Sequence, residues 1–340
     1  MAQQRRLFWF RRLALAGALL AAAVVVLGAW VRLTDAGLGC PDWPGCYGHI
    51  YPNAGGAAAA SGAHFGKALH EMTHRYFAGS LVIVITILLV WTVLFRKDRG
   101  QPIIAVVLLF VIVCLQAALG ALTVTLLLKP LIVTAHLLGG LSTLGLLWWL
   151  SLTPETRALT QREAALRKYA LAGLAVLIAQ IALGGWTSSN YAAVACPDFP
   201  TCQHSWWPRM DYRDAFVLWR GLDIDYEGGV LANPARVAIH FTHRLGALLA
   251  GSVLISLGIL AAVGARERRL ARAGRLLVLA AVIQITIGVA MVHWGVPLGL
   301  ATLHNAGAAY LVIGMVTLLR ALWPAAAIGM IPLHRVDPSR

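Results

Sequence analysis

Long apolar runs alternate with short polar segments along the whole chain. Eight of these runs reach about 20 residues, the length that a helix needs to cross the hydrocarbon core of a membrane. Leucine, alanine, valine and glycine fill them, and prolines stand mostly between them. The pattern predicts an all-α integral membrane protein with eight transmembrane helices, at residues 13–33, 69–95, 103–124, 131–153, 168–187, 237–262, 274–293 and 298–322.

Composition and charge support this assignment and orient the helices. Hydrophobic residues make up 59% of the chain and charged residues 12%, whereas a soluble domain carries about 25% charged residues. Of the 28 lysines and arginines, 19 lie at the two ends of the chain or in the second, fourth and sixth connections together with the adjoining ends of the runs. The positive-inside rule therefore predicts cytoplasmic N- and C-termini in the cytoplasmic (inner) membrane. The net charge of +14 follows from this topology, and no basic patch typical of nucleic-acid binding lies outside the predicted helices.

Two similar cysteine-bearing segments fall in outer connections of this topology. CPDWPGC begins at Cys40 and CPDFPTC begins at Cys196, and each ends on a second cysteine. Because the outer compartment is oxidising, we expect one disulfide within each loop. The alternative is a single zinc site that takes all four cysteines. The predicted disulfides are Cys40–Cys46 and Cys196–Cys202.

The cysteine segments belong to an internal duplication. LGAW at 27–30 matches LGGW at 183–186 with the same offset as the cysteines, 156 residues. LQAALG matches IQITIG, and TAHLLGG matches TLHNAGA, with an offset of 168 residues. We therefore predict two four-helix halves, 1–160 and 161–340. An even number of helices gives both halves the same orientation, so a pseudo-twofold axis along the membrane normal is expected.

Each half has one histidine in its second helix and one in its fourth. These are His74 and His136 in the first half, and His243 and His304 in the second, five to seven residues from the predicted outer helix ends. Ionisable side chains inside a membrane indicate a functional site. Two facing imidazoles in a four-helix bundle suit a bis-axial haem site, and one such pair has too few ligands for a closed zinc site. Hydrogen bonds between packed helices are the other interpretation.

The two halves differ three residues before the first histidine of each pair. Glu71 stands there in EMTHR, and His240 stands there in HFTHR. Glu71 precedes His74 by about one helical turn, so both side chains face the same side of the helix. The asymmetry indicates that one half holds a reacting haem and the other relays electrons. An ion pair of Glu71 with Arg75 or Lys67 is the structural alternative.

At these residues the chain resembles the heme A synthase family. The resemblance rests on RLTDAGLGCPDWPGC, HEMTHR, TAHLLGG, HFTHR and TLHNAGA, which begin at residues 32, 70, 134, 240 and 302. It implies an oxidoreductase that converts a methyl group of heme O into a formyl group. The oxygen would come from water, and the product, heme A, would serve terminal cytochrome oxidase.

The resemblance also implies roles for single residues. His74 and His136 would hold the substrate haem, whereas His243 and His304 would hold a haem b cofactor. Glu71 would be the catalytic residue, as a general base or by positioning the attacking water. The cysteine pair of the first outer loop corresponds to a disulfide of the family.

Two arginines and several partners remain to be placed. Arg75 and Arg244 directly follow the first histidine of each pair, and they would bind haem propionates or else neighbouring carboxylates and carbonyls. The implied partners are heme O, the heme O synthase that would supply it, an unidentified electron acceptor and membrane lipid, with homo-oligomerisation left open. No flavin, nicotinamide or nucleic-acid motif is visible. A bis-haem electron-transfer cytochrome and a haem carrier or assembly factor without chemistry are the competing classes.

The longest outer connection is rich in aromatic and charged residues. Residues 204–229 read HSWWPRMDYRDAFVLWRGLDIDYEGG. They would form short interfacial helices that cap the haem pocket. The alternative is an aromatic belt at the membrane interface.

Overall fold

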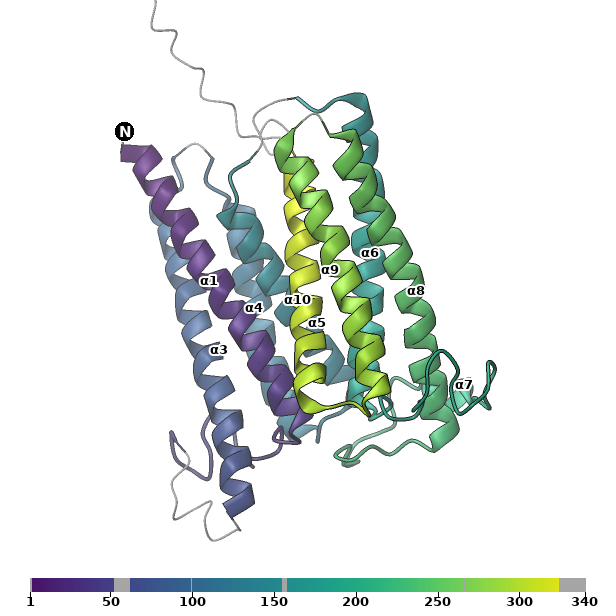
Figure 1. Ribbon diagram of the computed structural model, residues 1–340. Helices are drawn as coiled ribbons and strands as arrows, with labels where there is room; N and C mark the ends of the chain where they lie inside the picture. Colours follow the sequence, from purple (N-terminus) through teal and green to yellow (C-terminus); the bar gives the residue numbers. More distant parts are fainter. Residues whose placement is uncertain (1, 52–61, 99, 155–157, 266, 324–340) are drawn as a thin grey trace, which may run out of the picture.

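Eight long helices make up most of the molecule (Figure 1). The computed structural model describes residues 2–51, 62–98, 100–154, 158–265 and 267–323, and within these ranges it contains helices and no strand longer than an isolated bridge. All eight are long and apolar enough to span a membrane, which confirms the predicted number. They are α1 (Ala2–Leu33), α3 (Gly62–Leu94), α4 (Ile103–Thr125), α5 (Pro130–Ser151), α6 (Gln161–Ser189), α8 (Asn233–Gly264), α9 (Arg268–His293) and α10 (Leu298–Ala321), and α7 (Tyr212–Ala215) is a single turn.

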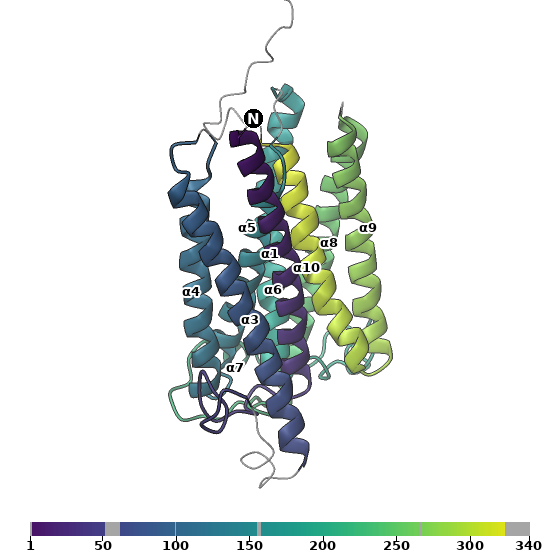
Figure 2. The ribbon, with the colours of Figure 1, turned by 90° about the vertical axis from the view of Figure 1, so that its left-hand side faces the viewer.

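The long helices run side by side in two groups that share an apolar core (Figures 1 and 2). In the first helix group, α1, α3, α4 and α5 contact one another in turn, and α5 closes onto α1. In the second helix group, α6, α8, α9 and α10 do the same, and α10 closes onto α6. Contacts of α1 with α10, and of α5 with both α6 and α10, join the groups.

Local sequence signals explain where several helices begin. Thr160 and Glu163 form a reciprocal capping box at the start of α6, which satisfies two of the free N–H groups there. A proline stands in the first turn of α5 and of α8, where its missing N–H costs nothing.

The structure extends some helices beyond the predicted apolar runs. The helix α3 begins at Gly62 rather than residue 69, and its first turns project beyond the neighbouring helices (Figure 2). His74 is therefore the thirteenth residue of its helix, and His136 is the seventh of α5. A hydropathy window detects only the apolar part of a helix, so it missed these polar first turns.

The two cysteine loops and α7 lie at one end of the bundle, which we call the disulfide end (Figure 1). The start of α1 and the end of α10 lie at the opposite end. Between α6 and α8 the chain forms a long connection that folds back onto the first helix group. There the N–H of Tyr226 donates to the Leu127 carbonyl at 3.1 Å, and Lys67 forms an ion pair with Glu227 at 3.2 Å.

A buried lysine anchors this connection. Lys129 precedes α5 and is 2% exposed. Its ammonium group lies 3.6 Å from the ring centroid of Trp219 and donates a hydrogen bond to the Gly221 carbonyl. Such a desolvated cation–aromatic contact contributes about 2 kcal/mol. Because only one helical turn forms here, most of the predicted interfacial helices are absent among residues 204–229, and the connection is a strap held by side-chain contacts.

Candidate functional site

A large cavity opens in the first helix group at the disulfide end. Its volume is about 870 Å³, within the range of small-molecule sites. His74 of α3 and His136 of α5 both line it, and so do Glu71 and Arg75. Residues of the first cysteine loop, among them Trp43, complete the wall at the disulfide end. The structure thus gathers the predicted residues of the first half around one space.

Each of the four predicted histidine rings lies against a glycine of a neighbouring helix. A methyl group on that glycine would stand between 2.9 and 3.5 Å from the ring carbon Cε1, so the rings depend on the missing side chains for their position. The internal duplication contained a sequence signal for these ring contacts, because the four glycines recur in the LGAW/LGGW and LQAALG/IQITIG matches. The contacts are Gly28–His74, Gly120–His136, Gly184–His243 and Gly288–His304.

The histidines also approach one another in the predicted pairs. His74 interacts electrostatically with His136, and His243 with His304. The Nδ1 atoms of His74, His136 and His304 are buried without a hydrogen-bond partner in the described part of the chain. His243 differs, because the amide nitrogen of Gln180 lies 3.0 Å from its Nδ1 and donates to its carbonyl at 3.0 Å. Paired, sheltered imidazoles are residues that could ligate a haem iron.

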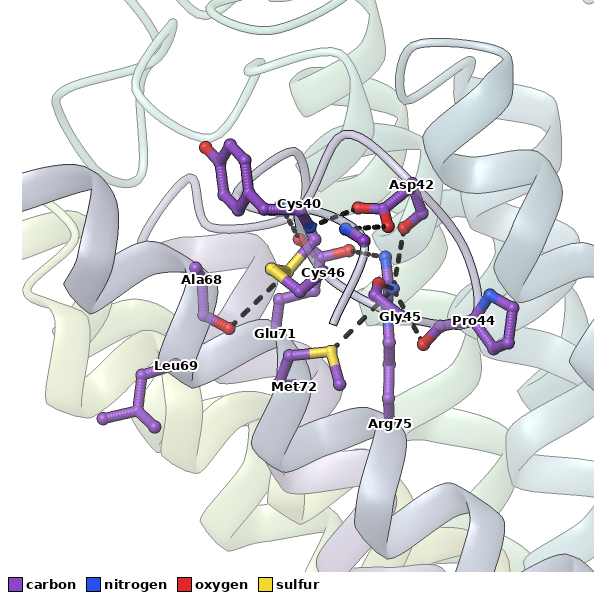
Figure 3. Close-up of a disulfide and its surroundings, with 12 residues drawn as sticks. Cys40, Asp42, Pro44, Gly45, Cys46, Ala68, Leu69, Glu71, Met72 and Arg75 are labelled. Carbon is purple, nitrogen blue, oxygen red and sulfur yellow. Dashed lines mark hydrogen bonds and ion pairs between the residues drawn. A yellow bond between two sulfur atoms is a disulfide. The ribbon is translucent and has the colours of Figure 1, made fainter. Parts of the chain in front are cut away.

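Glu71 lines the same cavity as the first histidine pair, and it is fixed there by contacts with the cysteine loop and Arg75 (Figure 3). It is 4% exposed. Its Oε2 accepts the N–H of Cys40 at 2.8 Å, and its Oε1 accepts Nη2 of Arg75 at 2.6 Å. The ion pair with Arg75, which was the structural alternative, is therefore present. Lys67 is engaged elsewhere, with Glu227. The carboxylate ties α3 to the cysteine loop while it lines the cavity.

Arg75 and Arg244 hold the two cysteine loops in equivalent ways. Arg75 donates to the carbonyls of Asp42 and Gly45 at 2.9 and 2.5 Å (Figure 3). Arg244 donates to the carbonyls of Thr201 and Cys196 at 2.8 and 2.9 Å. The sequence left two interpretations of these arginines, binding of haem propionates or of neighbouring carboxylates and carbonyls. The structure contains the contacts of the second kind: carbonyls for both arginines, and a carboxylate for Arg75.

His240 occupies the place of Glu71 in the second helix group. It is buried, and its Nε2 accepts Nε of Arg244 at 3.3 Å. The second group thus replaces the carboxylate–guanidinium ion pair by a hydrogen bond from a guanidinium to an imidazole at this position. The asymmetry seen in the sequence is an electrostatic difference between the two sites.

Both predicted disulfides are present, so the zinc alternative is wrong. Cys40 is bonded to Cys46, and Cys196 to Cys202, with Cα–Cα distances of 4.8 and 4.6 Å. The aspartate inside each loop shapes the turn. Burial opposes ionisation of Asp42, but hydrogen bonds from the N–H groups of Gly48 and Tyr47 lower the pKa of this aspartate below its usual value.

We predict different consequences for removing the two disulfides. Closing so short a loop contributes about 2 kcal/mol to the free energy of unfolding, so the paired Cys→Ser variants of either loop should lose a similar amount, measured by unfolding in detergent. Only the Cys40/Cys46 variant should also disturb the cavity, because this loop lines the cavity and places the backbone N–H of Cys40 against Glu71. Equal ligand binding in the cavity by both double variants would contradict this difference.

Several side chains at the site were not predicted from the sequence. Arg32 of α1 and Asn305 of α10 line the cavity, although they lie far apart in the chain. Gln180 and Gln284 each donate to the carbonyl of a paired histidine. The two glutamines share one signal, since each precedes a ring-contacting glycine by four residues.

Comparison with known proteins gives consistent relatives. The sequence matches the COX15-CtaA family, described as cytochrome oxidase assembly protein, over residues 11–316. It is 40% identical to the heme A synthase of Shewanella oneidensis over 94% of this chain and 97% of that protein. It is 26% identical to the heme A synthase of Halalkalibacterium halodurans over 83% of this chain and 86% of that protein. It is 28% identical to the heme A synthase of Exiguobacterium sibiricum over 67% and 75%, respectively.

Fold and site together define an integral membrane protein of eight apolar helices with two pairs of sheltered histidines. The similarity extends over nearly the whole chain and includes every helix that carries one of these histidines. The chain belongs to the COX15-CtaA family of cytochrome oxidase assembly proteins.

Proposed function

We propose that this protein is a heme A synthase. It oxidises a methyl group of heme O to a formyl group and so supplies heme A for terminal cytochrome oxidase. The observation that carries the proposal is the cavity lined by His74, His136 and Glu71, in a chain 40% identical to a protein named heme A synthase. The cavity is large, mostly apolar and provided with two imidazoles, as binding of a substrate haem requires.

The proposed arrangement consists of two halves, residues 1–160 and 161–340, related by a pseudo-twofold axis along the membrane normal. The contacts between the groups support it, because α1 with α10 and α6 with α5 are equivalent under the repeat. The disulfide end faces the outer compartment, where thiols are oxidised, and the termini are cytoplasmic. Both histidine pairs then lie near the outer face of the cytoplasmic (inner) membrane.

The reaction requires a base and an outlet for electrons. Converting the methyl group and one water molecule to a formyl group releases four electrons and four protons. His74 and His136 hold the substrate by its iron, and Glu71, one turn from His74, accepts protons at a carboxylate oxygen or orients the water. The first cysteine loop, which includes Trp43, covers the cavity at the disulfide end and restricts the entry of bulk water.

The second site suits a resident haem b. His243 and His304 would be its axial ligands, and the glycine contacts at Gly184 and Gly288 leave room for their rings. When bound, haem b would accept and donate one electron at a time. The residues of the chain position it: Gln180 and Gln284 fix the backbone at the two histidines by hydrogen bonds to their carbonyls.

The proposed partners follow from this chemistry. Heme O comes from a heme O synthase in the same membrane, and the electrons leave to an acceptor that the sequence does not identify. Lipid surrounds the exposed apolar faces of the helices. A homo-oligomer is compatible with this arrangement.

Haem extraction tests the function against its two competitors. The protein is produced in membranes that make heme O, and the extracted haems are identified by pyridine spectra and mass spectrometry. A heme A synthase yields heme A, an electron-transfer cytochrome yields haem b alone, and a carrier without chemistry yields unmodified heme O. Absence of heme A from membranes that contain folded protein and heme O would refute the proposal.

We predict that alanine in place of one of these glycines impairs only the site whose histidine ring the glycine contacts. In a Gly28→Ala variant the new methyl group would stand 2.9 Å from the His74 ring and displace it. Because a misplacement of about 1 Å can cost 10²-fold in rate, heme A formation should fall about 10- to 100-fold while haem b content is kept. Gly184→Ala is the matched control, since it presses on His243 and should lower haem b content instead. Identical haem profiles for the two variants would contradict the assignment of the sites.

A further inference from the structure

Two arginines line the cavity in the described part of the chain, and they differ in how their donors are used. The guanidinium of Arg75 is engaged by the Glu71 carboxylate at 2.6 Å and by loop carbonyls. Its charge is balanced by a carboxylate that is itself buried. Arg75 therefore has little capacity left for a carboxylate brought by a ligand.

Arg32 lies in the last turn of α1 at the seam between the two helix groups. Its side chain is 14% exposed. Nη2 donates to the Ser188 carbonyl of α6 at 2.7 Å, and the guanidinium carbon lies 4.2 Å from the ring centroid of Tyr191. These contacts hold the side chain in place. Its Nε, however, is buried and has no hydrogen-bond partner among the described residues, an arrangement that costs free energy until an acceptor arrives.

The charge of Arg32 is only partly compensated. Asp35 accepts Nη1 at 3.2 Å, but this carboxylate is 44% exposed. The same oxygen of Asp35 also accepts the Tyr191 hydroxyl at 2.6 Å. Burial, together with this hydrogen bond, raises the pKa of Tyr191, so the hydroxyl remains a donor. A shared, solvated carboxylate screens Arg32 weakly, and positive potential remains at the edge of the cavity.

We propose that Arg32 is a carboxylate-binding residue of this cavity and holds a propionate of the substrate haem. The inference rests on the proposed function, because it assigns a contact of that substrate. Haem is an apolar disc with two carboxylates, and a mostly apolar cavity needs a cation where those carboxylates lie. Because Nε has no accessible surface, the side chain must shift for a ligand in the cavity to reach it. Nε and a neighbouring Nη then form a planar edge that binds both oxygens of one carboxylate, and the unpartnered Nε–H gains its acceptor.

The test compares two ligands that differ only at their carboxylates. Ferric protoporphyrin haem and its dimethyl ester are titrated into detergent-solubilised protein that already carries haem b, and binding is followed by the Soret absorbance. A charge-assisted hydrogen bond corresponds to about 10- to 100-fold in affinity, so wild type should prefer the free acid by that factor. Arg32→Gln should lose the preference by binding the acid more weakly and the ester unchanged.

The outcomes separate binding from a structural role. If Arg32 only joins the helix groups, Arg32→Gln will weaken acid and ester equally, and the proposal is wrong. If the variant binds both ligands as wild type does, the proposal is wrong as well. Tyr191→Phe is the matched control, because it removes a neighbouring hydrogen bond and should change the acid-to-ester ratio by less than about twofold.

Failure of the proposed function would look different. The titration needs no turnover, so a chain that makes no heme A but loses its acid preference in Arg32→Gln would keep the carboxylate site and lose the assigned reaction. Heme A formation by the wild type, together with an unchanged acid-to-ester affinity ratio in Arg32→Gln, would keep the assigned reaction and refute the carboxylate site.

Discussion

Glu71→Gln should stop heme A formation while the fold and haem b content are kept. Glutamine preserves the size of the side chain and an oxygen that accepts the Cys40 N–H, but it is not a base. The disulfide keeps the shape of the loop, and the Arg75 contacts with carbonyls keep the loop attached to α3. Loss of a general base lowers the rate by about 10²–10⁴-fold. Extracted haem should therefore contain heme O, or a partly oxidised alcohol, in place of heme A.

The structure makes a control for this variant necessary, since Glu71 also fastens the loop. His240→Ala removes the residue at the equivalent place in the second helix group, where it contacts Arg244, and it should harm activity less. Resistance of the first cysteine loop to limited proteolysis shows whether the loop has stayed packed against α3. A Glu71→Gln protein with a closed loop and normal heme A output would remove Glu71 from the chemistry.

Alanine in place of the paired histidines should separate the two sites. His243→Ala or His304→Ala should deplete haem b at least about tenfold, because even changes next to a metal ligand cost 10- to 100-fold in affinity. His74→Ala or His136→Ala should leave haem b in place and abolish product formation. Haem content of the purified variants, together with heme A extracted from the membranes, measures both effects.

These four variants also test the model of two iron ligands per site. Each histidine belongs to a long helix, and its ring packs against a glycine of a neighbouring helix. Removal of the ring should therefore leave a cavity without unfolding the chain. Thermal unfolding of each variant in detergent serves as the check on folding. Full haem content and full activity in all four would show that the histidines are not iron ligands.

Much of the architecture was predictable because it follows from composition and repetition. Apolar runs of membrane length gave the eight helices. The matched offsets divided the chain into two halves and so paired His74 with His136 and His243 with His304, and the members of each pair interact electrostatically in the structure. The spacing of the cysteines within two short loops was sufficient to predict both disulfides.

Contacts between distant segments could not be predicted in this way. Position after a histidine left Arg75 with two kinds of partner, propionates or neighbouring carboxylates and carbonyls, and it did not show that the carbonyls belong to a loop 30 and 33 residues away. Arg32 was passed over because its partner carbonyl lies 156 residues along the chain. The burial of Lys129 depends in the same way on Trp219, which reaches it from the second helix group's long connection. Periodicity carries no information on such pairs.

The seam at Arg32 has a consequence for the organisation of the chain. Arg32 contacts Ser188, and Asp35 contacts Tyr191, and in both pairs the partners are 156 residues apart, which is the offset of the duplication. In an assembly of two identical four-helix chains, each of these residues would have met its own copy, with aspartate opposite aspartate and arginine opposite arginine. A single chain that carries both halves is free of that constraint, because each position can hold its own residue. A charged and hydrogen-bonded seam between unlike residues, with two unlike sites beside it, is therefore not accessible to two identical chains.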